Sequence, residues 1–187
     1  MKPSFVIKIV IALAVSLVLY GCAGDPVHRP FTILYDLKIS FTDDAWNGKT
    51  IPDGQQCPAF GGNGSTPGLA VENIPPQANA LILEFSNMSH LPLDNGGQGR
   101  IGYRFNPGTQ KIILPPVPGN TFNLPKPFFV IAAHRKPFQS KPGAYLPPCS
   151  GGKGNYYYLV VKAILLPESL EIPAELLGRG KIPLGRY

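Results

Sequence analysis

The sequence predicts a mainly β, single-domain protein built on antiparallel β-sheets, with long Gly/Pro-rich loops and little helix. The chain holds 21 Gly and 22 Pro among its 187 residues, and both residue types are unfavourable inside helices. Its apolar residues fall into short runs rich in β-branched and aromatic side chains, bounded by turn-forming residues, which is typical of strands. The length suits one domain of about 100–200 residues that buries a core of its own.

The first 21 residues are predicted to be a signal peptide. They carry Lys2 and Lys8 and no acidic residue, and the apolar run Ile9–Leu19 follows. That run is shorter than the ~20 residues of a membrane-spanning helix and matches the core of a signal peptide. We expect residues 22–30 to be a tether in front of a domain at 31–187.

A lipid anchor is predicted at Cys22. Leu19-Tyr20-Gly21-Cys22 resembles the bacterial lipobox, in which the Cys is acylated and becomes the mature N-terminus. Ala23 and Gly24 follow, without an Asp, which resembles the outer-membrane sorting pattern. Several acyl chains give a stable anchor. We therefore expect a lipoprotein of the bacterial cell envelope that faces the periplasm from the outer membrane; a plain secretory signal with an incidental Cys is the alternative.

The domain is predicted to consist of strands joined by long turns. The run NYYYLVVKAILL near the end is the strongest strand, because it is long, aromatic and β-branched. The predicted strands are Phe31–Phe41, Ala80–Phe85, Ile101–Phe105, Lys111–Leu114, Phe128–Ala133 and Asn155–Leu166. Asp43–Pro67 is predicted to be a loop, and a short helix is predicted around Pro173–Leu177.

Two cysteines lie in the predicted domain, Cys57 and Cys149. In an exported protein, such a pair predicts a disulfide, because the compartment is oxidising. The alternative is two free buried thiols. The two Cys and the scattered His28, His90 and His134 show no spacing typical of a zinc site, so we expect neither a metal nor another cofactor.

The charge pattern argues against a nucleic-acid partner. Without Lys2 and Lys8, 15 basic and 11 acidic residues remain, a net charge of about +4. Apart from three near the C-terminus, the basic residues are spread along the sequence, whereas nucleic-acid binders cluster them on one face. A mild basic balance fits loose attraction to anionic lipid or glycan, or an ordinary solvated surface.

No catalytic motif is found, so we expect a protein that is not an enzyme. No Ser lies in a G-x-S-x-G turn, and no acidic pair is arranged for acid–base catalysis. The segment Ser150-Gly151-Gly152-Lys153-Gly154 looks superficially like a phosphate-binding loop, but it lacks the G-x-x-x-x-G-K-[ST] pattern. We interpret it as a flexible turn between strands.

Three motifs follow one another in a fixed order along residues 31–187. The first is GNGSTPGLAVENIP at 62–75, and the second is GAYLPP at 143–148 together with NYYYLVVKA at 155–163. The third is the C-terminal LGRGKIPLGRY at 177–187. In order and approximate spacing they resemble the phosphatidylethanolamine-binding protein family, in its bacterial YbhB/YbcL (Raf kinase inhibitor-like) type. The resemblance implies that family's β fold.

The resemblance also implies a ligand pocket, and this chain departs from the family pattern there. The family builds it from Asp-Pro-Asp, a His-Trp pair and a Gly-x-His-Arg turn. Here Asn87-Met88-Ser89 replaces the first, no His-Trp pair occurs near Arg100, and Asn155-Tyr156 replaces the His-Arg pair. Tyr145 matches the family's Gly-Tyr position. We expect a remodelled pocket in which Asn87 and Arg100 donate hydrogen bonds to an anion, near Ser89, Tyr145 and Asn155; a vestigial pocket is the alternative.

Two functions fit these observations. The first is a non-enzymatic, envelope-anchored lipoprotein that binds a small anion or a phospholipid head group in the remodelled pocket. The second is a structural or accessory lipoprotein that docks onto an envelope protein complex and keeps only a vestigial pocket. A hydrolase ranks last, because the sequence offers no catalytic constellation. Fold resemblance does not decide between the first two functions.

Overall fold

The computed structural model describes residues 34–135, 141–169 and 173–187. The predicted signal peptide, the tether and the acylation site at Cys22 lie outside these residues. Within the described part of the chain, no helix is long and apolar enough to cross a membrane.

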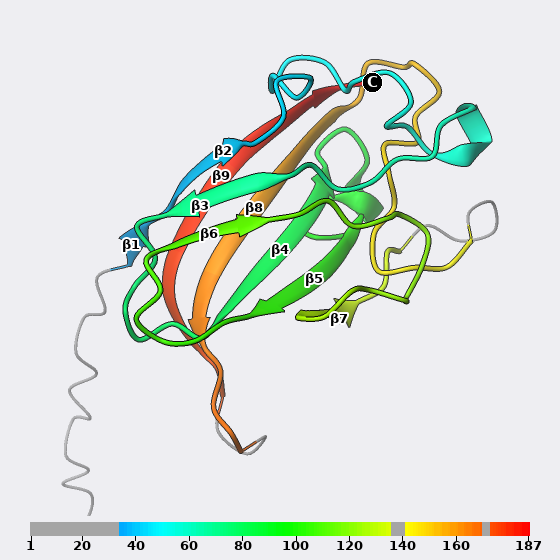
Figure 1. The fold of residues 1–187 in the computed structure, drawn as a ribbon. Coiled ribbons are helices and arrows are strands. Elements are labelled where there is room, and N and C mark those ends of the chain that lie inside the picture. Colours follow the sequence, from blue (N-terminus) through cyan, green and yellow to red (C-terminus); the bar gives the residue numbers. More distant parts are fainter. Residues whose placement is uncertain (1–33, 136–140, 170–172) are drawn as a thin grey trace, which may run out of the picture. The chain divides into compact units, whose positions relative to one another are not determined.

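The described chain forms two β-sheets packed face to face (Figure 1). The six-stranded sheet has the order β1-β9-β8-β4-β5-β7, and the three-stranded sheet has the order β2-β3-β6. All neighbouring strands are antiparallel except β1 and β9, which are parallel. The strands are β1 Tyr35–Asp36, β2 Lys38–Phe41, β3 Leu69–Glu72, β4 Ala80–Asn87, β5 Gly99–Arg104, β6 Lys111–Leu114, β7 Phe128–Ala132, β8 Tyr156–Leu165 and β9 Glu175–Arg186.

The mainly β prediction is confirmed, and most predicted strands lie within two residues of the observed ones. The strand predicted at Phe31–Phe41 is instead divided between the two sheets: β1 joins β9 and β2 joins β3. Leu37, at the break, is buried in the core. β3 was not predicted, because its four residues lie inside the Gly- and Pro-rich motif at 62–75.

The helix predicted around Pro173–Leu177 is wrong. The chain from Glu175 instead forms β9, which pairs with β8 along its length. Exposed and buried residues alternate through its middle, as expected for a strand with two different faces. Three Gly and Pro183 obscure this pattern in the sequence, and a register shift in the pairing of β8 with β9 lies next to Pro183, where a residue without an N–H is tolerated.

The core lies between the two sheets. In β4, Leu81, Leu83 and Phe85 point inward and are at most 3% exposed, and alternate residues of β8 join them. β3 and β6 contribute buried Leu, Val and Ile from the opposite side. Because the small sheet covers only this face, the alternate residues of β4 and β8 form the other face of the six-stranded sheet.

The predicted disulfide between Cys57 and Cys149 is confirmed. It joins residues 92 positions apart, with a Cα–Cα distance of 5.2 Å. A backbone hydrogen bond also links the two segments that carry these cysteines, since the N–H of Cys57 donates to the carbonyl of Pro148 at 2.9 Å. The two long loops predicted from their Gly and Pro content are therefore fastened to each other beside β8.

Candidate functional site

A small hollow lies where β4 ends and β8 begins. Its volume is about 190 Å³, and it opens to solvent. We call it the Asn87 pocket; its lining residues are Asn87, His90, Leu93, Cys149, Ser150, Lys153 and Asn155. Two of the predicted ligand-binding residues, Asn87 and Asn155, therefore lie together in it, as the sequence motifs implied.

Asn87 is held so that its amide nitrogen is the group left for a ligand. It is the last residue of β4 and is 3% exposed. Its Oδ1 accepts a hydrogen bond from the N–H of Ser89 at 3.0 Å, so the orientation of the amide is fixed. Among the described residues, no acceptor takes a hydrogen bond from Nδ2. A neutral donor pair therefore remains available at the wall of the pocket.

Ser89 positions the pocket without lining it. Its N–H holds Asn87, and its Oγ accepts a hydrogen bond from the N–H of Tyr156 at 3.0 Å. Ser89 thereby joins the end of β4 to the start of β8 and fixes the separation of the two pocket walls.

The loop before β8 supplies further donors. The backbone N–H groups of residues 150–154 donate no hydrogen bond to any described residue. Gly151, Gly152 and Gly154 all have φ between 69° and 75°, a conformation that glycine adopts without steric cost. Runs of unpaired N–H groups at such turns form anion-binding concavities. Lys153, in the same loop, adds an exposed ammonium group.

The C-terminus and two tyrosines support this loop from behind. The Ser150 hydroxyl donates to the carbonyl of Tyr187, and the N–H of Cys149 donates to the Tyr157 hydroxyl at 3.2 Å. Burial raises the pKa of the phenols of both Tyr157 and Tyr145. Both stay neutral at physiological pH and add no negative charge behind the pocket.

Tyr145 lies in the core and not in the pocket wall. It is 1% exposed and its ring centroid is 4.5 Å from that of Phe85. Its hydroxyl has no hydrogen-bond partner in the described structure. The residue that matched the family's Gly-Tyr position thus packs between the pocket and the core, out of reach of a ligand.

Arg100 lies on the opposite face of the six-stranded sheet from Asn87. It pairs across the strands with Glu84, whose side chain alternates with the inward-pointing Leu83 and Phe85. Its Nε is 3.3 Å from Glu84 Oε1, and its Nη2 donates to the carbonyl of Asn95 at 2.9 Å. The structure therefore does not bring Arg100 together with the other predicted site residues.

Sequence reasoning missed two ionisable residues of the pocket. His90 lies in the turn after β4, and Lys153 lies in the Gly-rich loop that we interpreted as a flexible turn. The available indication was the cluster of Gly, Ser and Lys within residues 150–154. No group of three or more His, Cys, Asp or Glu in the described ranges is arranged to hold a metal ion.

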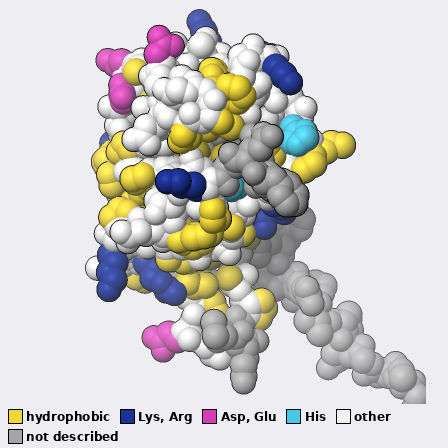
Figure 2. Space-filling model, turned by 90° about the vertical axis from the view of Figure 1, so that its right-hand side faces the viewer, with side chains coloured by type: hydrophobic (Ala, Val, Ile, Leu, Met, Phe, Trp, Pro, Cys, Tyr) yellow, Lys and Arg dark blue, Asp and Glu magenta, His cyan; other side chains and the backbone are white. Residues whose placement is uncertain are grey.

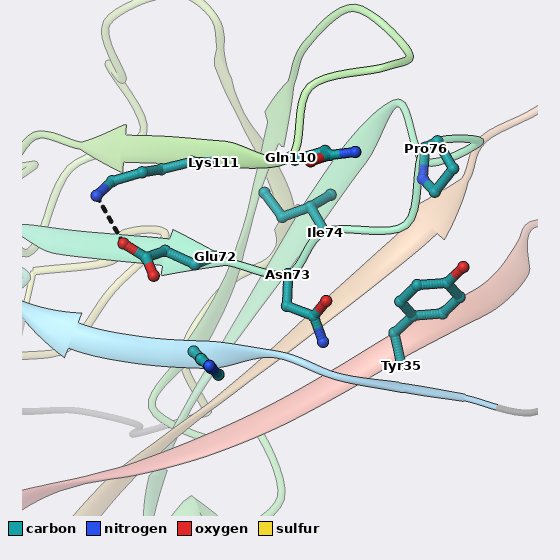
Figure 3. A pocket seen from close by; sticks show the side chains of 8 residues that line it. Tyr35, Glu72, Asn73, Ile74, Pro76, Gln110 and Lys111 are labelled. Atoms are coloured by element: carbon teal, nitrogen blue, oxygen red, sulfur yellow. Dashed lines mark ion pairs between the residues drawn. The ribbon is translucent and has the colours of Figure 1, made fainter.

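A second, larger hollow of about 630 Å³ lies beside the small sheet, where β3 ends at Glu72 and β6 begins at Lys111. Figure 3 shows Glu72 and Lys111 toward one end of it, and Tyr35 and Pro76 toward the other. Lys111 Nζ is 2.6 Å from Glu72 Oε1, and this hydrogen-bonded ion pair lowers the pKa of the Glu72 carboxyl. Asn73 donates its amide to the carbonyl of Asp36. The lining of this hollow also includes the exposed Lys38. Unlike the Asn87 pocket, it carries a carboxylate, that of Glu72.

Comparisons with known proteins give one solved structure to report. No protein-family model matches the sequence, and a search of curated proteins finds no match either. The structure is similar to that of a protein from Chlamydia trachomatis described as a phosphatidylethanolamine-binding protein homologue, with 16% sequence identity and a TM-score of 0.49. The match covers 81% of this chain and 97% of that chain.

Proposed function

We propose that this protein is a non-enzymatic, envelope-anchored lipoprotein that binds a small anion, or the anionic head group of a lipid, in the Asn87 pocket. The observation that carries the proposal is the set of donors without acceptors around the hollow. These are the Asn87 amide, the backbone N–H groups of Ser150 and Lys153, and the Lys153 ammonium.

The balance of charge favours an anion over a cation or a neutral ligand. No residue that lines the pocket carries a carboxylate. Lys153 supplies a cationic ammonium group, and the ring of His90 can add an N–H donor. Charge-assisted hydrogen bonds from such groups to phosphate or carboxylate oxygens are stronger than neutral ones. A volume of about 190 Å³ suits a phosphate-sized group.

The chemistry of the lining supports binding without turnover. The Ser150 hydroxyl already donates to a backbone carbonyl, and Cys149 is held in the disulfide. His90 is therefore not paired with a free nucleophile among these residues, although nucleophilic catalysis requires such a pair.

The anchoring part of the proposal depends on the sequence Leu19-Tyr20-Gly21-Cys22. A mass measurement on the mature chain tests it directly. Acyl chains on an N-terminal Cys22 are expected, and a mature chain that begins elsewhere or lacks acylation contradicts it.

Calorimetric titration of the full chain with inorganic phosphate tests the binding. We expect saturable binding at millimolar or lower concentration, weakened about fivefold by Lys153→Ala, because an exposed charge pair contributes up to ~1 kcal/mol. Lys126→Ala is the matched control, since Lys126 is an exposed loop lysine outside the pocket. Equal affinities of the two variants, or no binding, argue against the pocket and favour docking onto an envelope complex.

A further inference from the structure

One face of the six-stranded sheet collects basic residues that are far apart in the sequence. They come from three strands, and we call the surface that they form the basic sheet face. Its cations are Arg100 and Arg104 of β5, Lys162 of β8, and Arg179 and Lys181 of β9.

The strand register places these side chains on the same face. Lys162 is paired directly with Arg179, and Glu84 is paired with Arg100. Residues opposite each other in adjacent strands project to the same side. Arg104 and Lys181 lie an even number of residues from Arg100 and Arg179, so they project to that side as well. The intervening residues of β4 and β8 point into the core, so this face is the one that the small sheet leaves uncovered.

The face carries a surplus of positive charge. The acidic side chains of the array are Glu84 and Asp94. The two carboxylate oxygens of Glu84 lie 3.3 Å from Arg100 Nε and 2.8 Å from Lys162 Nζ. Asp94 Oδ1 accepts a hydrogen bond from the hydroxyl of Tyr158, whose ring lies under Lys181. Glu168 lies at the margin, in a shallow hollow beside Arg104. Five cations against Glu84 and Asp94 give a local charge of about +3.

The cations are accessible and held in place by their neighbours. Arg104, Arg179 and Lys181 are exposed, while the side chains of Arg100 and Lys162 are 31% and 29% exposed. Two of them rest on aromatic rings: Arg104 lies 5.3 Å from the centre of the Phe129 ring, and Lys181 lies 3.9 Å from that of Tyr158. Such cation–π contacts limit the freedom of the side chains without neutralising their charge.

The array extends in two dimensions. Its residues lie on strands β9, β8 and β5, and β4 lies between β8 and β5. At about 4.8 Å per strand, the cations span about 15 Å across the sheet, and they also spread along the strands. Figure 2, which looks at a different side of the domain, shows basic side chains among apolar, acidic and uncharged atoms.

We propose that the basic sheet face adsorbs to the surface of an anionic lipid bilayer. A planar array of positive charge complements a plane of anionic head groups, and each Lys or Arg near such a surface adds to the attraction. A linear polyanion favours a groove, and the hollow beside Arg104 lies only at the margin of the array. No exposed large apolar side chain lies at the centre of the array, between the cations. The contact with the bilayer is therefore electrostatic adsorption, which salt weakens. This proposal does not depend on the Asn87 pocket.

Lysine labelling of the full chain tests the proposal within one molecule. The chain is incubated with vesicles of phosphatidylcholine alone, or with 30% phosphatidylglycerol, and is treated with the uncharged reagent acetic anhydride. Peptide mass spectrometry then gives the acetylation rate of each lysine. Lys162 and Lys181 report on the basic sheet face, while Lys38 of β2 and Lys111 of β6, exposed on the small sheet, are internal controls. We expect Lys181 and Lys162 to be acetylated several-fold more slowly on anionic vesicles at low salt, and at the original rate in 0.5 M NaCl.

A charge-reversal pair preserves both reporter lysines. In Arg104→Glu/Arg179→Glu we expect the protection of Lys162 and Lys181 to disappear. Each cation contributes about fivefold to the partitioning of the protein onto anionic vesicles, so the loss of two cations weakens partitioning about 25-fold even before the added negative charges are counted. Lys38→Glu/Lys49→Glu, which lies outside the array, changes the net charge equally and should keep the protection of Lys162 and Lys181. Circular dichroism and an intact disulfide show that each variant is folded.

Three results would overturn the proposal. One is equal acetylation of Lys181 on neutral and anionic vesicles. Another is equal loss of protection in the two charge-reversal pairs, which would indicate attraction by net charge alone. The third is protection by dextran sulfate without protection by vesicles, which would identify the partner as an anionic polymer.

Discussion

Replacing Tyr145 by Phe removes a buried hydroxyl that has no partner. The Tyr145 ring is 1% exposed, and its oxygen makes no hydrogen bond in the described structure. An unsatisfied buried polar group costs about 1–3 kcal/mol, while the small void left by the oxygen offsets part of the gain. We therefore expect Tyr145→Phe to raise the free energy of unfolding at pH 7 by about 1 kcal/mol.

Urea unfolding of both proteins, with the disulfide intact, measures this difference. For a slope of about 2 kcal/mol per M, the midpoint should rise by about 0.5 M. A midpoint that falls by as much would refute the reasoning, because it would mean that the hydroxyl makes a stabilising hydrogen bond.

The same variant has an expected pH dependence. Burial raises the pKa of Tyr145 in the folded state, so above about pH 10 the unfolded chain releases a proton that the folded chain retains. The contribution of this residue to the free energy of unfolding is therefore complete below about pH 10. It decreases as the pH rises further, by at most about 1.4 kcal/mol per pH unit. Tyr145→Phe should lose stability more slowly between pH 10 and 11 than the parent does; parallel losses would contradict the assignment.

Two further predictions concern the scaffold. Reducing Cys57–Cys149, 92 positions apart, should cost about 4–5 kcal/mol from the loop length, measured as the urea midpoint with and without dithiothreitol; an unchanged midpoint after verified reduction would contradict this. Gly99→Ala should cost about 3 kcal/mol or more, because φ is 120° and a Cβ would lie 2.0 Å from the Ala144 carbonyl oxygen. Gly108→Ala, with φ of 87° and no atom within 4 Å, should cost less, and equal costs would show that the close contact is relieved.

The fold was predictable where local pattern and burial agree. The run that became β8 combines β-branched and aromatic residues with no Gly or Pro, and it lies at the centre of the sheet. β9 was not predictable by the same rule. A Cβ at Gly178 would lie 3.1 Å from the carbonyl oxygen of Tyr35, and one at Gly180 would lie 2.6 Å from that of Leu37. Close approach by the neighbouring chain, and not strand propensity, therefore explains these residues.

The site was predictable only in part, because its residues meet through long loops. Asn87 and Asn155 followed from aligned motifs, and the structure brings them into one hollow. Lys153 and His90 fall in turns, where the sequence pattern does not fix the direction of a side chain. Arg100 was expected beside Asn87, but the alternation of side chains along paired strands directs the two to opposite faces of the sheet.

The basic sheet face depends even more on long-range pairing. In the sequence, Arg100, Lys162 and Arg179 are widely separated, so the charge looks evenly distributed. Strand register brings Lys162 beside Arg179, and brings Arg100 within two strands of Lys162. Such a surface appears only when the order of the strands is known.

The most direct test of the account is the behaviour of the Asn87 side-chain amide during a phosphate titration. In ¹H–¹⁵N spectra, the Asn87 Nδ2 resonances and the backbone amides of residues 150–154 should shift together and reach saturation at one common midpoint. Lys153→Ala should move that midpoint to higher phosphate concentration, whereas Lys126→Ala should not. If these resonances stay unchanged up to tens of millimolar phosphate, or shift no more than amides elsewhere in the chain, the Asn87 pocket is not an anion site.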